Sequence, residues 1–86
     1  MEENIRETII RLFKQKGPMK DLGEDDRFFE LGVSSLTIID LQIGVEAALG
    51  ITVPTSDLMR LGTMRGWIEA YSTKARQRDA VSTASA

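Results

Sequence analysis

The first apolar residues of the chain recur three and four positions apart, as they do along one side of an amphipathic helix. They are Ile5, Ile9, Leu12 and Phe13. Asn4 precedes the first of them, and Glu7 lies three residues after Asn4. This pattern is typical of a helix N-terminus. Glycine is a frequent helix stop, and proline disfavours helical geometry in the residue before it. We therefore expect a first helix that begins at Asn4 and stops at Gly17-Pro18.

The most apolar helical segment follows a polar loop and begins at Ser34, a favourable N-cap residue. It runs to about Leu49, and Gly50 is the expected C-terminal stop. At about 100° per residue this helix has two apolar sides. The predicted core side consists of Ile38, Leu41, Val45, Ala48 and Leu49. The opposite side, which we call the apolar strip, consists of Leu36, Ile39, Ile43 and Ala47.

A domain this small has difficulty burying both sides of one helix. Either the long loop covers the apolar strip, or the strip is exposed to a partner protein. Gly44 lies inside this helix, where glycine costs about 1 kcal/mol relative to alanine. We expect it to mark a close approach by another part of the backbone.

Two further helices are expected in the second half of the chain. The β-branched run Ile51-Thr52-Val53-Pro54 is typical of a short extended connector. Thr55 or Ser56 is expected to cap a brief helix at Asp57 to Leu61.

Gly62-Thr63 then interrupts the chain, and a last helix follows. Its apolar residues share one face, which we interpret as core, and they are Met64, Trp67, Ile68, Tyr71 and Ala75. The pattern ends near Arg76 to Arg78. Residues 79–86 are small and polar, and we expect a disordered tail there, with the domain occupying residues 1–78.

Residues 17–34 form a long connection between the first two main helices. A loop of this length in a compact domain is usually functional or pinned to the core. Phe28, Phe29 and Leu31 are the candidate pins, and at least one phenylalanine should be buried. The acidic run Glu24-Asp25-Asp26 is interpreted as a solvated turn, with a functional role left open.

Together these elements predict an all-α domain of three main helices plus one short helix. The expected architecture is a small four-helix bundle with a long loop between helices 1 and 2. No membrane span is expected, because the apolar stretch from Leu36 to Val53 is interrupted by Asp40, Gln42 and Glu46.

The chain contains neither cysteine nor histidine. This excludes thiolate nucleophiles, disulfides and the usual zinc ligands, and it removes the commonest general base. A self-sufficient serine hydrolase therefore ranks last among the candidate functions, and no catalytic or metal-binding residue is assigned. Residues 1–11 lack the layout of a signal peptide, so we expect a cytoplasmic location.

The net charge of -2 conceals an acidic centre, because residues 21–57 contain one basic and eight acidic residues. Such a surface favours basic proteins as partners over nucleic acid. A helix-turn-helix DNA-binding function therefore has little support.

Ser35 would occupy the first helical position after its neighbour Ser34, the helix cap. Backbone N–H groups at that end lack helical partners and the helix dipole is positive, so a phosphate ester on the hydroxyl would be stabilised. No base lies nearby in the sequence to activate the hydroxyl. Ser35 is thus better suited to modification by another enzyme than to catalysis.

Two longer runs carry a resemblance to a known family. These are Phe28-Phe29-Glu30-Leu31-Gly32-Val33-Ser34-Ser35-Leu36 and Glu46-Ala47-Ala48-Leu49-Gly50-Ile51-Thr52-Val53-Pro54. The chain, from its first helix to about Ala75, resembles the acyl and peptidyl carrier proteins. This resemblance implies a four-helix, non-catalytic carrier domain. It implies that Ser35 receives a 4'-phosphopantetheine arm from coenzyme A, attached by a phosphopantetheinyl transferase that uses Mg²⁺.

The resemblance also implies how the domain would work. The thiol of the arm would hold cargo as a thioester, which supplies thiol chemistry to a chain without cysteine. The second helix would dock partner enzymes through Leu36, Ile39, Asp40, Ile43 and Glu46. The implied partners are a cargo-loading ligase or acyltransferase and downstream synthase or transferase enzymes with basic, apolar patches. We expect a monomer that binds neither nucleic acid nor membrane.

Two departures from the fatty acid carriers change the expected pathway. Ser34 stands where many of them have Asp, and Glu46 stands alone where they often have several acids. A specialised pathway of polyketide, nonribosomal peptide or aminoacyl transfer is therefore favoured. The alternative is an unmodified helical interaction module that acts through the apolar strip.

Overall fold

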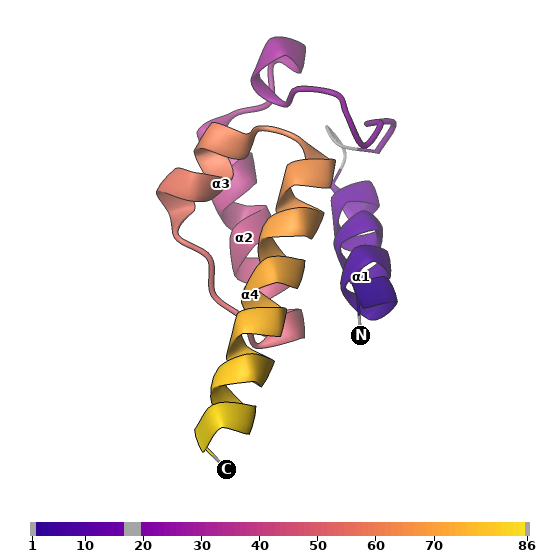
Figure 1. The fold of residues 1–86 in the computed structure, drawn as a ribbon. Coiled ribbons are helices and arrows are strands. Elements are labelled where there is room, and N and C mark those ends of the chain that lie inside the picture. The colour runs from indigo at the N-terminus through magenta and orange to yellow at the C-terminus, as the bar shows by residue number, and fades with distance from the viewer. Residues whose placement is uncertain (1, 17–19, 86) are drawn as a thin grey trace.

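The structure is a computed structural model that describes residues 2–16 and 20–85, with side chains described for residues 5–16 and 20–77. Three longer helices, α1 (Glu2–Gln15), α2 (Ser35–Leu49) and α4 (Met64–Ser85), lie alongside one another (Figure 1). α3 (Thr55–Leu61) is short, and the loop before α2 contains one 3-10 turn, η2 (Phe29–Leu31). Residues 2–16 and 20–85 contain no strand, so the predicted all-α bundle is confirmed.

An aromatic cluster joins α1, the long loop and α4 at the centre of the bundle. The Phe13 ring lies 5.5 Å from that of Phe28 and 5.1 Å from that of Trp67, between ring centroids. Tyr71 continues the cluster, 6.3 Å from Trp67. All four side chains are fully buried, so the loop is tied to the core through Phe28. The predicted core face of α4 is confirmed, because Met64, Trp67, Ile68, Tyr71 and Ala75 are all buried.

α1 starts earlier than the sequence pattern predicted. The helix begins at Glu2, so Asn4 lies inside it and the predicted N-cap is wrong. The local sequence pattern marks a residue that can cap a helix, but α1 continues past that residue toward the N-terminus. Ile5, Ile9 and Phe13 are buried as expected, whereas the predicted stop at Gly17-Pro18 lies outside the described residues.

α2 ends where predicted, at Gly50, whose φ of 67° places it in the left-handed region. The Gly50 N–H donates to the Glu46 carbonyl oxygen at 2.8 Å, the usual closing contact of a helix C-terminus. Ile38, Leu41 and Val45 form the buried side.

Two predicted members of that side were placed differently. Ala48 is exposed and Leu49 is half-buried, so the predicted burial of Ala48 is wrong. Ala48 lies at the edge of the buried face, where neighbouring helices do not reach it. Gln42 is buried in its place, because its amide has three polar partners. Nε2 donates to the Val53 carbonyl oxygen at 3.0 Å and to Glu46 Oε2 at 3.2 Å, and Oε1 accepts from Thr55 Oγ1 at 2.8 Å.

The connector and α3 follow the prediction except at the cap. Ile51 and Val53 of the connector are buried. Pro54 occupies the N-cap position and makes no side-chain hydrogen bond there, so the predicted cap at Thr55 or Ser56 is wrong. The Thr55 hydroxyl is instead used by Gln42.

α4 starts after Gly62, as predicted, and Thr63 Oγ1 accepts a hydrogen bond from the Gly66 N–H at 3.0 Å. The helix continues to Ser85, whereas the sequence predicted an end near residues 76–78 and a disordered tail over 79–86. The domain boundary at residue 78 stays a prediction. Among the described residues, no helix combines the length and apolar character that a membrane crossing requires.

Candidate functional site

The turn before α2 is built so that two serines follow a buried anchor. η2 ends at Gly32, whose φ of 82° is left-handed and favours glycine. The next residue, Val33, is buried, and its N–H donates to the Phe28 carbonyl oxygen at 3.1 Å. Because Phe28 and Val33 both reach the core, the chain enters α2 at a fixed position.

Ser34 is the N-cap of α2, as predicted. Its Oγ accepts a hydrogen bond from the Thr37 N–H at 3.3 Å and lies 3.1 Å from Thr37 Oγ1. Its carbonyl oxygen accepts from the Ile38 N–H at 3.2 Å. The Ser34 side chain is therefore committed to the helix.

Ser35 is the first residue of α2, and it is exposed. No hydrogen bond involving its hydroxyl is formed with the residues that the structure describes. Thr37 is already capped by Ser34, so the N–H groups of Ser35 and Leu36 remain directed out of the helix end, where the dipole is positive. No acidic residue lies in the first turn of α2. A phosphate ester fits this environment.

The apolar strip of α2 is exposed, so the first alternative left open by the sequence, a strip covered by the long loop, does not hold for the described residues. The exposed fractions are 78% for Leu36, 38% for Ile39 and 64% for Ile43, and Ala47 is exposed as well. The part of the long loop that the structure describes does not cover it. The role of these residues in docking stays a prediction.

Two of the three candidate loop pins also contribute to the exposed apolar surface. Phe28 is fully buried, whereas Phe29 is 46% exposed and Leu31 is 59% exposed. The prediction that at least one phenylalanine is buried is confirmed, but Phe29 and Leu31 do not act as pins. Exposed apolar side chains thus lie on η2 just before Ser35 and on α2 after it.

Asp40, a predicted docking residue, forms an ion pair with Lys16, the residue after α1, and keeps 59% of its side chain exposed. Beside this pair, between α1 and α2, lies an open hollow of about 200 Å³ that Gly44 and Ile43 help to line. A Cβ placed on Gly44 would meet nothing within 4 Å. The expected close backbone approach at Gly44 is therefore wrong.

Glu46, another predicted docking residue, faces the interior of the domain with one oxygen. Its Oε2 accepts hydrogen bonds from the Val53 N–H at 3.1 Å, from Gln42 Nε2 at 3.2 Å and from the Tyr71 hydroxyl at 3.2 Å. Burial, and then the nearby Glu46 carboxylate, raise the pKa of Tyr71 well above its usual range. Glu46 therefore holds the connector against α2 and α4, and its part in docking stays a prediction.

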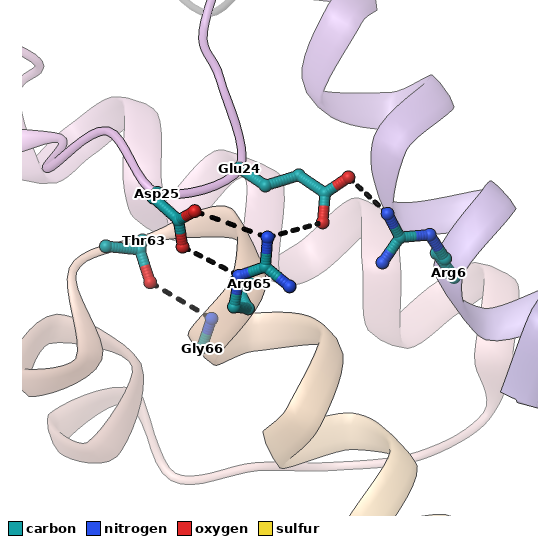
Figure 2. A network of polar contacts seen from close by, with 6 residues as sticks. All are labelled: Arg6, Glu24, Asp25, Thr63, Arg65 and Gly66. Carbon is teal, nitrogen blue, oxygen red and sulfur yellow. Dashed lines mark hydrogen bonds and ion pairs between the residues drawn. The ribbon is translucent and has the colours of Figure 1, made fainter.

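The acidic run of the loop is a structural anchor, which the sequence analysis missed. Figure 2 shows the Asp25 carboxylate directed toward Arg65 at the start of α4, and the Glu24 carboxylate between Arg65 and Arg6 of α1. The interpretation of this run as a solvated turn holds for Asp25, whose side chain is 75% exposed, but not for Glu24, whose side chain is 25% exposed. No local pattern could reveal the contact, because Asp25 and Arg65 are forty positions apart.

Electrostatics at this anchor follow from the geometry. The hydrogen bonds from Arg65, followed by its charge, hold the pKa of Asp25 below its usual value, although partial desolvation acts in the opposite direction. The same contact raises the pKa of Arg65. Among the described residues, no group of three or more acidic side chains is arranged to hold a metal ion.

Comparison with known proteins decides the family. Residues 3–71 match the family described as "Phosphopantetheine attachment site". The chain belongs to the phosphopantetheine-binding carrier family. Members of this family carry a 4'-phosphopantetheine prosthetic group and are generally non-catalytic carriers, so the predicted family and cofactor are confirmed.

A curated relative of this carrier domain is hybrid PKS-NRPS synthetase 1 of Dothistroma septosporum (strain NZE10 / CBS 128990). The two are 25% identical over 76 residues, which is 87% of this chain and 2% of the synthetase. This chain thus spans only a small fraction of the relative that it matches. No solved structure matches significantly. Carrier domains of such synthetases work with synthase partners and a phosphopantetheinyl transferase.

Proposed function

We propose that this protein carries acyl or aminoacyl intermediates as thioesters on a 4'-phosphopantetheine arm attached to Ser35. The observation that carries the proposal is the exposed Ser35 hydroxyl at the N-terminus of α2 in a chain of the phosphopantetheine attachment family. Ser34 has its oxygen engaged as the helix cap, and Ser72 is buried. Ser56 is exposed but belongs to the seven-residue α3, outside the run Phe28 to Leu36 that carries the resemblance at the attachment site.

The environment of Ser35 supports attachment by an external enzyme. The Ser35 oxygen would form a phosphoester bond as the phosphoanhydride of coenzyme A breaks and adenosine 3',5'-bisphosphate leaves. The hydroxyl proton would pass to a base on the transferase, since the chain contains no histidine. The N–H groups of Ser35 and Leu36 would then stabilise the bound phosphate. Once bound, the arm supplies the thiol that this cysteine-free chain lacks.

A specialised biosynthetic pathway is favoured over fatty acid synthesis. The resemblance to a hybrid polyketide and peptide synthetase supports this choice. The serine before Ser35 and the single acid at Glu46 support it too. The expected partners are a cargo-loading ligase or acyltransferase and a downstream synthase or transferase. The monomeric state and a cytoplasmic location stay predictions from the sequence.

Intact mass after co-expression with a broad-specificity phosphopantetheinyl transferase tests the attachment. We expect the wild type and Ser34→Ala to gain the mass of one arm and Ser35→Ala to gain none. A wild type that gains no mass, or a Ser35→Ala protein that is still labelled, would overturn the proposal. The first of these outcomes would favour the alternative of an unmodified interaction module, which the exposed apolar strip also supports.

Docking through the apolar strip is tested by charge substitutions on α2. Ile39→Glu and Ile43→Glu should slow arm attachment or cargo loading while far-ultraviolet circular dichroism stays unchanged, because both side chains already contact water. Ile38→Glu is the contrasting variant, since Ile38 is fully buried and the substitution should unfold the domain. Unchanged kinetics in both strip variants would show that partners dock elsewhere.

A further inference from the structure

Arg65 holds the first half of the long loop through both its backbone and its side chain. Its N–H donates to the Glu24 carbonyl oxygen at 2.9 Å. Its guanidinium forms a bidentate contact with the Asp25 carboxylate, in which Nε donates to Oδ1 at 2.7 Å and Nη2 donates to Oδ2 at 3.2 Å (Figure 2). This fork geometry is specific to arginine, since lysine offers only a point charge.

A second arginine extends the same contact to α1. One oxygen of the Glu24 carboxylate pairs with Arg6, and the other lies 3.7 Å from Arg65 Nη2. The turn that presents these acids is itself braced, because Asp26 Oδ2 accepts from the Gly23 N–H at 2.8 Å. The loop is thereby tied to two helices at its first half.

The second half of the loop is held by Gly62, the C-cap of α3, which lies just before α4. The Phe28 N–H donates to the carbonyl oxygen of Gly62 at 2.9 Å, only three residues before Arg65. The Phe28 carbonyl oxygen in turn accepts from the Val33 N–H, and Val33 directly precedes the two serines. Arg65 and Gly62 thus hold the two halves of the loop from positions three residues apart, and the hydrogen bond between Val33 and Phe28 leads on to the start of α2.

We infer that Arg65 is a positioning residue for the modification of Ser35. It holds the loop that leads to Ser35 in the conformation that a phosphopantetheinyl transferase binds. The inference rests on the proposed attachment at Ser35. An enzyme that reaches Ser35 has to meet the adjoining loop, where Phe29 and Leu31 are exposed. A loop that is ordered beforehand loses less conformational entropy on binding, so its release weakens binding without changing the chemical step.

Arg65 is 51% exposed, so a direct contact with the transferase is the competing explanation. The two explanations differ in what they predict for Asp25. If Arg65 acts by holding the loop, then removing its partner carboxylate has the same effect as removing the arginine. If Arg65 contacts the transferase directly, Asp25→Asn leaves that contact in place.

The test is steady-state kinetics of arm attachment on Arg65→Gln, Asp25→Asn and the double variant. Each single variant should raise KM for the carrier by about two- to fivefold at low salt and leave kcat unchanged. This is the change in affinity expected from the loss of one partly exposed ion pair. The double variant should show no larger effect, and the difference from the wild type should shrink as salt screens the pair. Arg65→Lys should lie between the wild type and Arg65→Gln.

Arg60→Gln is the matched control. It removes the same charge from an exposed arginine whose ion pair, to Asp57 at 3.2 Å, stays within α3. Its KM should equal that of the wild type. Hydrogen exchange should be faster at residues 24–28 in Arg65→Gln than in Arg60→Gln, with circular dichroism the same in both.

The inference is overturned if Arg65→Gln leaves KM unchanged, if Asp25→Asn does not reproduce its effect, or if the effects of the two substitutions add. A drop in kcat alone, or unchanged exchange in the loop, would overturn it as well. These outcomes are distinct from failure of the proposed function, in which the wild type itself would accept no arm.

Discussion

At the residue scale, Ser34 and Ser35 are neighbours whose side chains have opposite surroundings. Ser34 Oγ caps α2, whereas the Ser35 hydroxyl points to solvent without a partner among the described residues. Residue type alone does not separate these roles. The one-residue offset at the helix start separates them, because only the side chain at the N-cap position reaches the third N–H of the helix.

Substitution of the two serines should therefore have different effects on stability. Ser34→Ala should lower the free energy of unfolding by about 1 kcal/mol, because the Thr37 N–H loses its acceptor. Ser35→Ala should leave it unchanged within about 0.5 kcal/mol. Urea unfolding followed by circular dichroism measures both. Equal losses in the two variants would contradict the assignment of Ser34 as the cap.

Tyr71 should make the domain sensitive to alkali. Burial and Glu46 raise its pKa in the folded state, so the folded protein keeps the phenol neutral while the unfolded chain ionises at about pH 10. Ionisation of Tyr71 should therefore not change the free energy of unfolding below about pH 10. As the pH rises above about 10, the free energy of unfolding should fall. Tyr71→Phe is the reference, and Tyr71 is the single tyrosine of the chain.

Urea unfolding of both proteins at several pH values between neutrality and strong alkali checks this. The wild type should lose stability relative to Tyr71→Phe only at the alkaline end. A constant difference between the two proteins across the series would show that the Tyr71 hydroxyl has the same pKa folded and unfolded.

At the element scale, α2 serves two surfaces at once. Its inner side supplies the core with Ile38, Leu41 and Val45, and its outer side carries the exposed apolar strip. The two serines stand at its N-terminus and Gly50 closes its C-terminus. Glu46 and Gln42, in its second half, hold the connector that leads to α3. The candidate attachment site and docking surface thus belong to one rigid element.

Gly44 is a place where this element can be strengthened. A Cβ at Gly44 meets open space, so Gly44→Ala should raise the free energy of unfolding by about 1 kcal/mol through helix propensity alone. Gly50→Ala is the contrasting variant: it should lower stability by about 1–2 kcal/mol, because its φ of 67° is left-handed. Chemical unfolding measures both. A destabilised Gly44→Ala would mean that the hollow beside α1 needs to stay open.

At the scale of the whole molecule, one aromatic cluster holds the site and the bundle together. Phe28 belongs to the loop that leads to Ser35, and its ring packs on Phe13 of α1 and, at 6.0 Å between centroids, on Trp67 of α4. A domain of this size has only a small total stability, so loss of one such side chain is a large fraction of it.

Replacement of Phe28 should therefore affect the fold and the site together. Phe28→Ala should cost about 3–5 kcal/mol, enough to leave much of the protein unfolded. Phe29→Ala, which truncates a 46% exposed ring, should cost far less and retain cooperative unfolding. Trp67 fluorescence and thermal unfolding measure the difference. Similar losses in the two variants would contradict the central place of Phe28.

Local patterns in the chain were enough to predict the helices, the glycine that ends α2, the Ser34 cap and the buried face of α4. Each of these depends on residues within a few positions of one another, as hydrogen bonding and periodicity in a helix do. The errors at Asn4, Thr55 and Ala48 lie at helix ends or at the edge of a buried face, where packing outweighs propensity.

The contacts between distant segments required the folded molecule. Which side of α2 is exposed, which phenylalanine is buried, and how Glu24, Asp25 and Glu46 are used all depend on how the helices come together. The pairing of Asp25 with Arg65 is the clearest case, because nothing in either neighbourhood specifies the other. A sequence shows which residues are charged, but the ion-pair partner of each is determined only when folding brings two remote positions within hydrogen-bonding distance.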